Sequence, residues 1–341
     1  MNLLGQSSHK EMASQPKYDP LTIVMYHYVR PIAKSPYPKL KGLEVDLFRE
    51  QIKYCRQHYT FVSMEQVVEA AASEEPLPKR PLLLTFDDGY VDHYEHVLPI
   101  LLEYQVPGAF YAAARSVLDR EMLDANKIQF LLASVADGKQ LTMMIEDAID
   151  RARDEFVLLS KHEYREKFWR AARLDSPSVK YCKHLLQHGL PDPVRSDILD
   201  VLFRKFVSND PSDFAEKVYL NLGHLKEMKA AGMHIGGHGG QHVWLNRLAP
   251  KAQAEDIDMS LHLLELVEAG DPFTFCYPHG GYNSETVAAL RARDCRAALT
   301  VDEGLANLDK TTLLTLPRID TIDLPTDAEA DLCDWTRKAT T

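Results

Sequence analysis

The chain has 341 residues, a formal net charge of −11 and a hydrophobic fraction of 45%. This composition is ordinary for a globular protein, and the length suits one large domain with an insertion or two domains. The acidic balance argues against a broad nucleic-acid surface, and no apolar run approaches the length of a bilayer span. We therefore expect no nucleic-acid partner and no integral membrane segment.

The amino-terminal residues and the cysteines bear on location. Residues 1–20 are polar and lack the apolar core of a secretory signal, so they are predicted to form a tail. The five cysteines are odd in number and show no CxxC spacing, which is typical of reduced thiols rather than of a disulfide framework. Together these features predict a cytoplasmic protein.

Strand and helix patterns alternate between residues 21 and 118. Strands are expected over 21–26, 59–62, 82–86 and 109–113, with helices between them. Asp46 is expected to cap the first of these helices, and Ser63 and Gln66 have the spacing of a capping box for the second. This alternation favours an α/β architecture with parallel strands.

The pattern changes over residues 119–220, where strand signals are scarce and helical periodicity is common. A structureless loop of this length is improbable, so we predict a helical insertion. Within it, His184 and His188 are four residues apart, a spacing more typical of a solvated helix face than of a metal site. The α/β pattern then resumes, which places the core at residues 21–118 and 221–325 and a tail at 326–341.

The stretch at residues 82–89, LLLTFDDG, combines a buried-strand pattern with two carboxylates. An isolated Asp-Asp-Gly is most often a simple turn. In barrels of parallel strands, however, catalytic residues sit at the carboxyl ends of the strands. Two adjacent carboxylates there need a counter-charge or a metal, because buried charge is costly. Asp87 and Asp88 are therefore candidate site residues.

A second candidate group follows the strand expected over residues 233–237. His238 and His242 are four apart, so on a helical turn both imidazoles would point the same way. Such a pair alone is a weak signal, because histidines also serve as hydrogen-bonded polar residues. Together with Asp88, the pair would form a two-histidine, one-carboxylate set that suits zinc or another divalent ion and leaves a position open for water and substrate.

These motifs resemble a known family. TFDDG at residues 85–89 and HGGQH at 238–242 look like the first two motifs of NodB-type polysaccharide deacetylases, carbohydrate esterase family four. The resemblance implies a distorted (β/α) barrel, here with a mainly helical insertion. It also implies that Asp88, His238 and His242 hold a divalent metal, Zn²⁺ before Co²⁺, Ni²⁺, Mn²⁺ or Fe²⁺. Asp87 would then be the general base that acts on a metal-activated water.

The later motifs depart from the family pattern. Cys276 stands where the family usually has the arginine that tethers the base, and Arg318 is the candidate replacement. The late-motif histidine that commonly acts as general acid is absent, which leaves His279 and His27 as candidates to protonate the leaving amine, with a structural role equally expected for either. By family analogy, the backbone N–H of His279 would help to hold the oxyanion. Gly239 replaces a serine or threonine whose hydroxyl could brace the loop.

The resemblance implies a metal-dependent hydrolase that removes an N-acyl group, acetyl being the first expectation, from a carbohydrate. Residues 26–27 also resemble a NodB-like subgroup of surface-carbohydrate biosynthesis, which by analogy favours an intracellular sugar precursor, nucleotide-linked or lipid-linked, over a wall polymer. The alternatives are a deformylase or another linear-amide hydrolase on the same fold, and a noncatalytic carbohydrate-binding barrel. The insertion would serve as a substrate lid or as the interface of a homo-oligomer.

Overall fold

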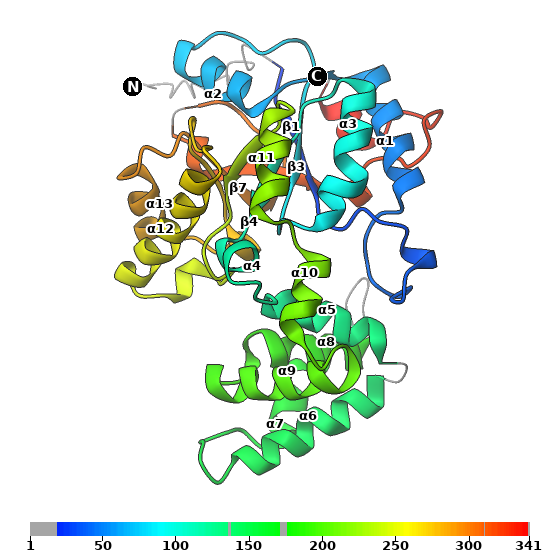
Figure 1. The fold of residues 1–341 in the computed structure, drawn as a ribbon, viewed down its shortest axis with the longest axis vertical. Coiled ribbons are helices and arrows are strands. Elements are labelled where there is room, and N and C mark those ends of the chain that lie inside the picture. The colour runs from blue at the N-terminus through cyan, green and yellow to red at the C-terminus, as the bar shows by residue number, and fades with distance from the viewer. Residues whose placement is uncertain (1–18, 136–137, 171–175, 310, 340–341) are drawn as a thin grey trace, which may run out of the picture.

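The structure is a computed structural model that describes residues 19–135, 138–170, 176–309 and 311–339. The tail predicted for residues 1–20 lies almost wholly outside these ranges. Figure 1 shows a strand-containing body at the top of the view and a purely helical segment below it. The helical segment is green, so it comes from the middle of the chain.

Seven parallel strands close into a barrel in the order β1, β8, β7, β6, β5, β4, β3 and back to β1. The predicted α/β barrel is confirmed. A further short strand, β2, pairs with β3 beside the ring. The strands are β1 Thr22–Tyr26, β2 Thr60–Phe61, β3 Pro81–Phe86, β4 Ala109–Ala112, β5 His234–Gly237, β6 Thr274–Cys276, β7 Ala297–Glu303 and β8 Leu316–Asp320.

Strand β3 is covered on both faces, because all six of its residues are buried. It pairs with β1 along all but its first residue, from Leu82 to Phe86, and with β4 at Thr85 and Phe86. Since every strand of the ring is parallel, all their carboxyl ends meet at one rim. That rim receives the residues that follow β1, β3, β5 and β6.

Helices surround the barrel, as expected for crossovers between parallel strands. They are α1 Val45–His58, α2 Met64–Ser73, α3 Leu98–Tyr104, α4 Ala114–Leu118, α11 Leu222–Ala230, α12 Pro250–Leu266 and α13 Ser284–Arg291. The capping box of Ser63 and Gln66 is confirmed at the start of α2. The N-cap predicted at Asp46 is wrong: Glu44 is the N-cap residue, extended at ψ 143° while its carboxylate accepts from Ala33, and Asp46 lies in the first turn.

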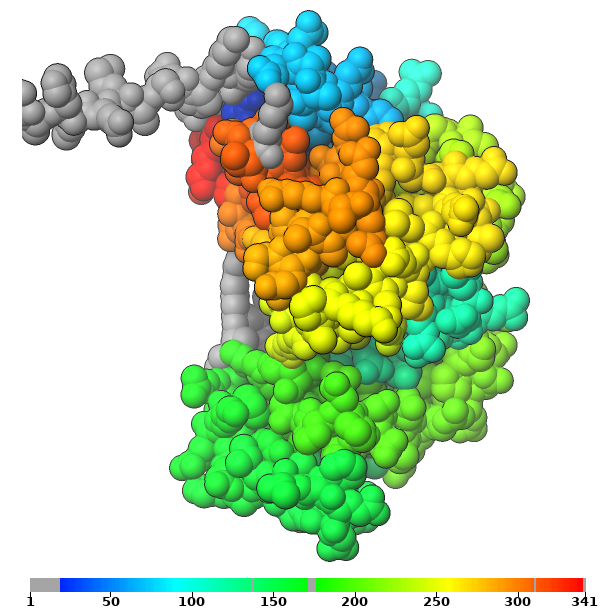
Figure 2. Space-filling view, turned by 90° about the vertical axis from the view of Figure 1, so that its left-hand side faces the viewer, coloured from blue at the N-terminus to red at the C-terminus, as the bar shows by residue number. Residues whose placement is uncertain are grey.

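The helical segment has a core of its own. It contains α5 Asp124–Ser134, α6 Gly138–Ala152, α7 Lys161–Phe168, α8 Pro177–His184, α9 Asp192–Phe206 and α10 Pro211–Val218. Ile145, Leu185 and Leu199 belong to a buried cluster drawn only from this segment. A second cluster, which includes Phe130 and Phe203 from the segment and Tyr28 from the barrel, joins the two parts. Figure 2 shows the segment packed directly beneath the barrel.

The carboxyl-terminal residues pack against the barrel helices. Helix α14, Asp334–Lys338, places the buried Thr336 hydroxyl 2.9 Å from both the Tyr54 and the Tyr59 hydroxyl oxygens. Residues 326–339, predicted as a tail, thus include a short helix docked on α1. Over the ranges that the structure covers, no helix is both long and apolar enough to cross a bilayer.

The separate core of the helical segment can be tested on helix α9. Leu199 is fully buried there, whereas Val201 on the same helix is 64% exposed. Leu199→Ala should lower the free energy of unfolding by about 2–5 kcal/mol, because it removes buried methyl groups and leaves a cavity. Val201→Ala should change it by no more than about 0.5 kcal/mol. Urea unfolding of both variants measures the difference, and equal values would contradict the core.

Candidate active site

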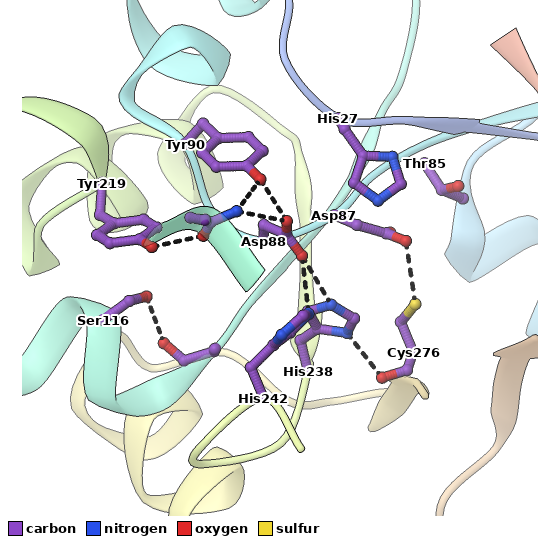
Figure 3. A network of polar contacts seen from close by, with 12 residues as sticks. His27, Thr85, Asp87, Asp88, Tyr90, Ser116, Tyr219, His238, His242 and Cys276 are labelled. Carbon is purple, nitrogen blue, oxygen red and sulfur yellow. Dashed lines mark hydrogen bonds and ion pairs between the residues drawn. The ribbon is translucent and has the colours of Figure 1, made fainter. Parts of the chain in front are cut away.

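Six predicted site residues line one cavity of about 160 Å³ at the carboxyl-end rim of the barrel. Arg318, the seventh, is buried behind Asp87. Figure 3 shows how the side chains from different strand ends converge on this point. The six cavity-lining residues are His27, Asp87, Asp88, His238, His242 and His279.

Asp88, His238 and His242 bring their ligand atoms together. Asp88 Oδ1 lies 3.2 Å from His238 Nε2 and 3.0 Å from His242 Nε2, and the three atoms lie within 4.8 Å of one another. All three side chains are buried. Two imidazole nitrogens and one carboxylate oxygen suit Zn²⁺ or a similar divalent cation, so these residues fit the metal that the resemblance implies.

The electrostatics of this cluster favour positive charge between its members. Burial alone would raise the pKa of Asp88, but the imidazoles of His242 and His238 hold it well below its usual value. Burial likewise opposes the charged form of His238, yet Cys276 and Asp88 beside it raise its pKa well above the usual value. A proton or a metal ion can supply the positive charge that this cluster favours.

The orientation of each ligand is set by its neighbours. The ring Nδ1 of His238 donates to the backbone carbonyl of Cys276 at 2.8 Å, which leaves Nε2 to face Asp88. Asp88 itself has φ of 72°, a left-handed conformation that costs energy in a residue with a side chain. Gly89 continues this tight bend at φ of 71°, and a Cβ there would lie 2.6 Å from the Cβ of Ala112.

The histidine motif does not form the helical turn that its spacing predicts. Residues 238–244 form a loop after β5, and the imidazoles converge because Gly239 and His242 adopt positive φ, 70° and 56°. Asp256 of α12 braces this loop by accepting hydrogen bonds from the N–H groups of Gly240 and Gln241 at 2.8 and 2.9 Å. A Cβ at residue 239 would lie 2.6 Å from the Asp256 carboxylate, so this carboxylate occupies the space beside the glycine.

Asp87 is held by Arg318 of β8. Two guanidinium nitrogens donate to the two carboxylate oxygens at 2.9 and 2.7 Å, and the third nitrogen, Nε, donates to the Thr300 carbonyl. Cys276 lies beside the pair, with Sγ 3.2 Å from Arg318 Nη2. Burial would raise the pKa of Asp87, but Arg318 lowers it to about 2. Position 276 carries no guanidinium, and Arg318 supplies one to the Asp87 carboxylate from strand β8 instead.

The two remaining histidines are held differently. The ring of His279 stacks on Trp244 at 3.7 Å, and Arg247 lies over the indole at 4.6 Å. Burial and the neighbouring His242 lower the pKa of His279 to about 2. His27 is only half-buried, and His93 fixes its backbone by donating from Nε2 to the His27 carbonyl at 2.9 Å.

The helical segment supplies one wall of the cavity, which the sequence motifs do not indicate. Its contributions are Ala125, Ile128 and Gln129 from α5, Lys183 from α8 and Gln187 just beyond it. A larger hollow of about 600 Å³ continues from the cavity between this segment and residues 241–248. His188 lines this hollow, and its ring nitrogen lies 2.8 Å from that of His184. Among the residues that the structure describes, neither histidine joins a group of three metal ligands.

Comparison with known proteins defines the class. The sequence pattern of the family described as polysaccharide deacetylase matches residues 74–162 and 215–298, about half of the chain. The chain therefore belongs to the polysaccharide deacetylase family. The unmatched residues 163–214 all lie within the helical segment.

Among individual relatives, the chain is 33% identical over 316 residues to the poly-beta-1,6-N-acetyl-D-glucosamine N-deacetylase of Escherichia coli K12. The match covers 92% of this chain but only 38% of that protein. Two solved structures share the fold at a TM-score of 0.55. The Streptococcus pyogenes deacetylase PplD in complex with acetate is 20% identical, over 91% of this chain and 95% of that one. IcaB from Ammonifex degensii is 18% identical, over 95% and 98%.

The contact between Arg318 and Asp87 can be tested by replacing the cation. Arg318→Met should lower the free energy of unfolding at neutral pH by about 3–5 kcal/mol, because it leaves the Asp87 carboxylate buried without a counter-charge. Arg318→Lys keeps the charge but loses the bidentate contact, so it should lower the free energy of unfolding by a smaller amount. Chemical denaturation measures both.

The matched control is the double variant Asp87→Asn with Arg318→Met, which removes both charges. It should recover part of the stability lost in Arg318→Met alone. If the stability lost in the double variant equalled the sum of the losses in the two single variants, the carboxylate and the guanidinium would not be coupled.

Proposed function

We propose that the protein is a metal-dependent hydrolase that removes an N-acetyl group from a carbohydrate. The observation that carries this proposal is the convergence, in one cavity, of a two-histidine, one-carboxylate cluster and a second carboxylate paired with arginine. Membership of the polysaccharide deacetylase family supports the reaction class. The name of the Escherichia coli relative supports a substrate that contains β-1,6-linked N-acetylglucosamine. Nucleotide-linked and lipid-linked sugars are the alternative carriers.

Asp88, His238 and His242 would hold the metal, Zn²⁺ before other divalent ions, because imidazole and carboxylate are ligands that zinc prefers. A bound divalent cation supplies a Lewis acid that polarises the acyl carbonyl and lowers the pKa of water from about 15.7 towards 7. The three residues are buried and line the cavity, so solvent screens their attraction for a cation only weakly. Their role as ligands is the first part of the proposal.

Asp87 would act as the general base. It lies next to Asp88 in the chain and lines the same cavity, and Arg318 keeps its carboxylate ionised and fixed in orientation. An ionised carboxylate can accept the proton of an attacking water. The alternative of a noncatalytic barrel is supported by the absence of an arginine at position 276 and of a late-motif histidine. The contact of Arg318 with Asp87 weakens the first of these two arguments.

His27 would donate a proton to the leaving amine. It lines the cavity beside Asp87, as Figure 3 shows, and its backbone is anchored by the buried His93. Burial and His242 lower the pKa of the His279 ring to about 2, which makes it a poor proton donor near neutral pH, so His279 would serve through its backbone N–H, which family analogy places at the oxyanion. A cytoplasmic location and a homo-oligomeric state stay predictions.

The role of Asp87 predicts a separation of metal binding from turnover. Asp87→Asn keeps the shape of the side chain but cannot accept the proton, so kcat should fall by about 10²–10⁴-fold while metal content stays near that of the native protein. Release of acetate and of free amine from β-1,6-linked N-acetylglucosamine oligomers measures turnover, and formate release from N-formyl analogues tests the deformylase alternative. Normal turnover in Asp87→Asn would contradict the role of Asp87 as general base.

The metal itself gives an independent prediction. Dialysis against a chelator should abolish activity, and adding back one equivalent of Zn²⁺ per chain should restore it. His238→Ala should lose the bound metal because it removes one of the three ligands. His162→Ala, whose side chain is 81% exposed on α7, is the matched control and should keep it. Elemental analysis of the purified proteins measures metal content, and full activity without metal would refute the proposal.

A further inference from the structure

A line of hydrogen bonds runs from Asp88 out of the barrel and into the helical segment. Tyr90 donates its hydroxyl to Asp88 Oδ2, and Asn126 of α5 donates from Nδ2 to the Tyr90 oxygen at 2.6 Å. Tyr219, which follows α10, donates to Asn126 Oδ1 at 2.5 Å and accepts from the Leu123 N–H at 3.1 Å. Figure 3 shows Asp88 and the two tyrosines in this arrangement. The first and the last helix of the segment are thus connected to one carboxylate.

The direction of these bonds is uniform. Each tyrosine hydroxyl accepts one bond from the side of the helical segment and donates one towards Asp88, and the Asn126 amide links them by accepting at Oδ1 and donating at Nδ2. Hydrogen bonds that all donate in the direction of an anion polarise one another, which strengthens the bond from the Tyr90 hydroxyl to Asp88. The reversed Asn126 amide would offer Tyr90 a carbonyl and Tyr219 a donor, so this sequence of donors also fixes the amide.

Burial makes the line costly to break. Tyr90 and Asn126 are 0% exposed and Tyr219 is 2% exposed, so any group that lost its partner would have no access to water. Asparagine is also a weak helix former, yet Asn126 occupies the third position of α5. Neither helix propensity nor apolar packing accounts for this residue, whereas its four side-chain hydrogen-bond partners do: Asp88, Tyr90, Gln129 and Tyr219.

Aromatic packing holds the line in place. Tyr28 stacks on Tyr90 with ring centroids 3.8 Å apart and donates its own hydroxyl to Gln129 Oε1 at 2.9 Å. The same Gln129 oxygen accepts from Asn126 Nδ2 at 3.0 Å. The amide of Asn126 is therefore fixed from both sides, and neither it nor Tyr90 can turn without breaking several contacts.

The line also divides the two oxygens of Asp88. Oδ1 faces the Nε2 atoms of His238 and His242, whereas Oδ2 accepts from Tyr90 and, at 3.5 Å, from Asn126 Nδ2. A carboxylate held in this way offers a single, oriented oxygen to the cation. Residues that hydrogen-bond to a metal ligand commonly set both its orientation and the affinity of the site.

We propose that Asn126 and Tyr219 are positioning residues for Asp88, acting through Tyr90 and through the longer contact of Asn126 Nδ2 with Asp88 Oδ2 at 3.5 Å, so that the helical segment completes the metal site. This inference rests on the proposed function, in which Asp88 is a metal ligand. It assigns to residues 119–220 a role beyond forming one wall of the cavity. The reaction itself still belongs to Asp87 and to the residues at the strand ends.

The test measures metal affinity in two variants that remove a link without adding a charge. Tyr90→Phe deletes the hydroxyl that donates to Asp88, and Asn126→Leu deletes the amide. Each should weaken Zn²⁺ binding by about 10–100-fold, measured by competition with a chromophoric chelator. The visible absorption of the Co²⁺-loaded protein should also change, because it reports the ligand geometry. Tyr219→Phe is nearly isosteric and deletes only the hydroxyl that donates to Asn126, so it should weaken binding in the same direction and tests the segment even if Asn126→Leu fails to fold.

The control is Leu131→Ala, a fully buried residue of the same helix that belongs to the separate core of the segment. It should destabilise α5 while leaving the zinc affinity and the Co²⁺ spectrum unchanged. Unaltered zinc affinity and Co²⁺ spectrum in Tyr90→Phe, or in both Asn126→Leu and Tyr219→Phe, would overturn the inference but not the proposed function. An equal loss of affinity in Leu131→Ala would overturn it too, because general loosening of the helix would then explain the effect. If the unmodified protein bound no metal, the proposed function would fail together with the inference.

Discussion

The structure depends on two adjacent carboxylates buried at the end of one strand. Asp87 and Asp88 are 2% and 3% exposed, and neither could stay ionised there without a positive partner. The two carboxylates have different positive partners: Asp87 faces the guanidinium of Arg318, and Asp88 faces the imidazoles of His238 and His242. These partners lie 231 and 150 residues further along the chain, so the charges are matched only once the barrel has closed.

This requirement explains which site residues could be predicted from the sequence. The convergence of Asp88, His238 and His242 could be predicted because imidazole and carboxylate pairs with the spacing of metal ligands form a short local pattern at strand ends. Arg318 could be proposed because a buried carboxylate needs a cation and the usual position holds a cysteine. Its contact with Asp87 is seen only in the folded barrel, where β8 and β3 flank β1. The order of strands and helices followed from periodicity and was mostly correct.

The remaining contacts could not be predicted, because no local pattern marks them. Asp256 and Asn126 are ordinary polar residues on helices, and the partners that lie outside their own helices are 15 to 93 residues away. The histidine loop shows the limit most clearly. A spacing of four residues indicated a helical turn, but Gly239 and His242 adopt left-handed conformations and Asp256 fills the space beside the glycine. Tertiary contacts therefore override the local preference at the site.

The stack of Trp244 between His279 and Arg247 has a spectroscopic consequence. The chain contains three tryptophans, one in each part of the molecule: Trp169 in the helical segment, Trp244 at the cavity and Trp335 in the carboxyl-terminal helix. Because an indole in contact with an imidazole and a guanidinium senses changes in either, Trp244 is a built-in fluorophore for the active site. Proteins that retain one tryptophan each would let the three parts be followed separately during folding, without any added dye.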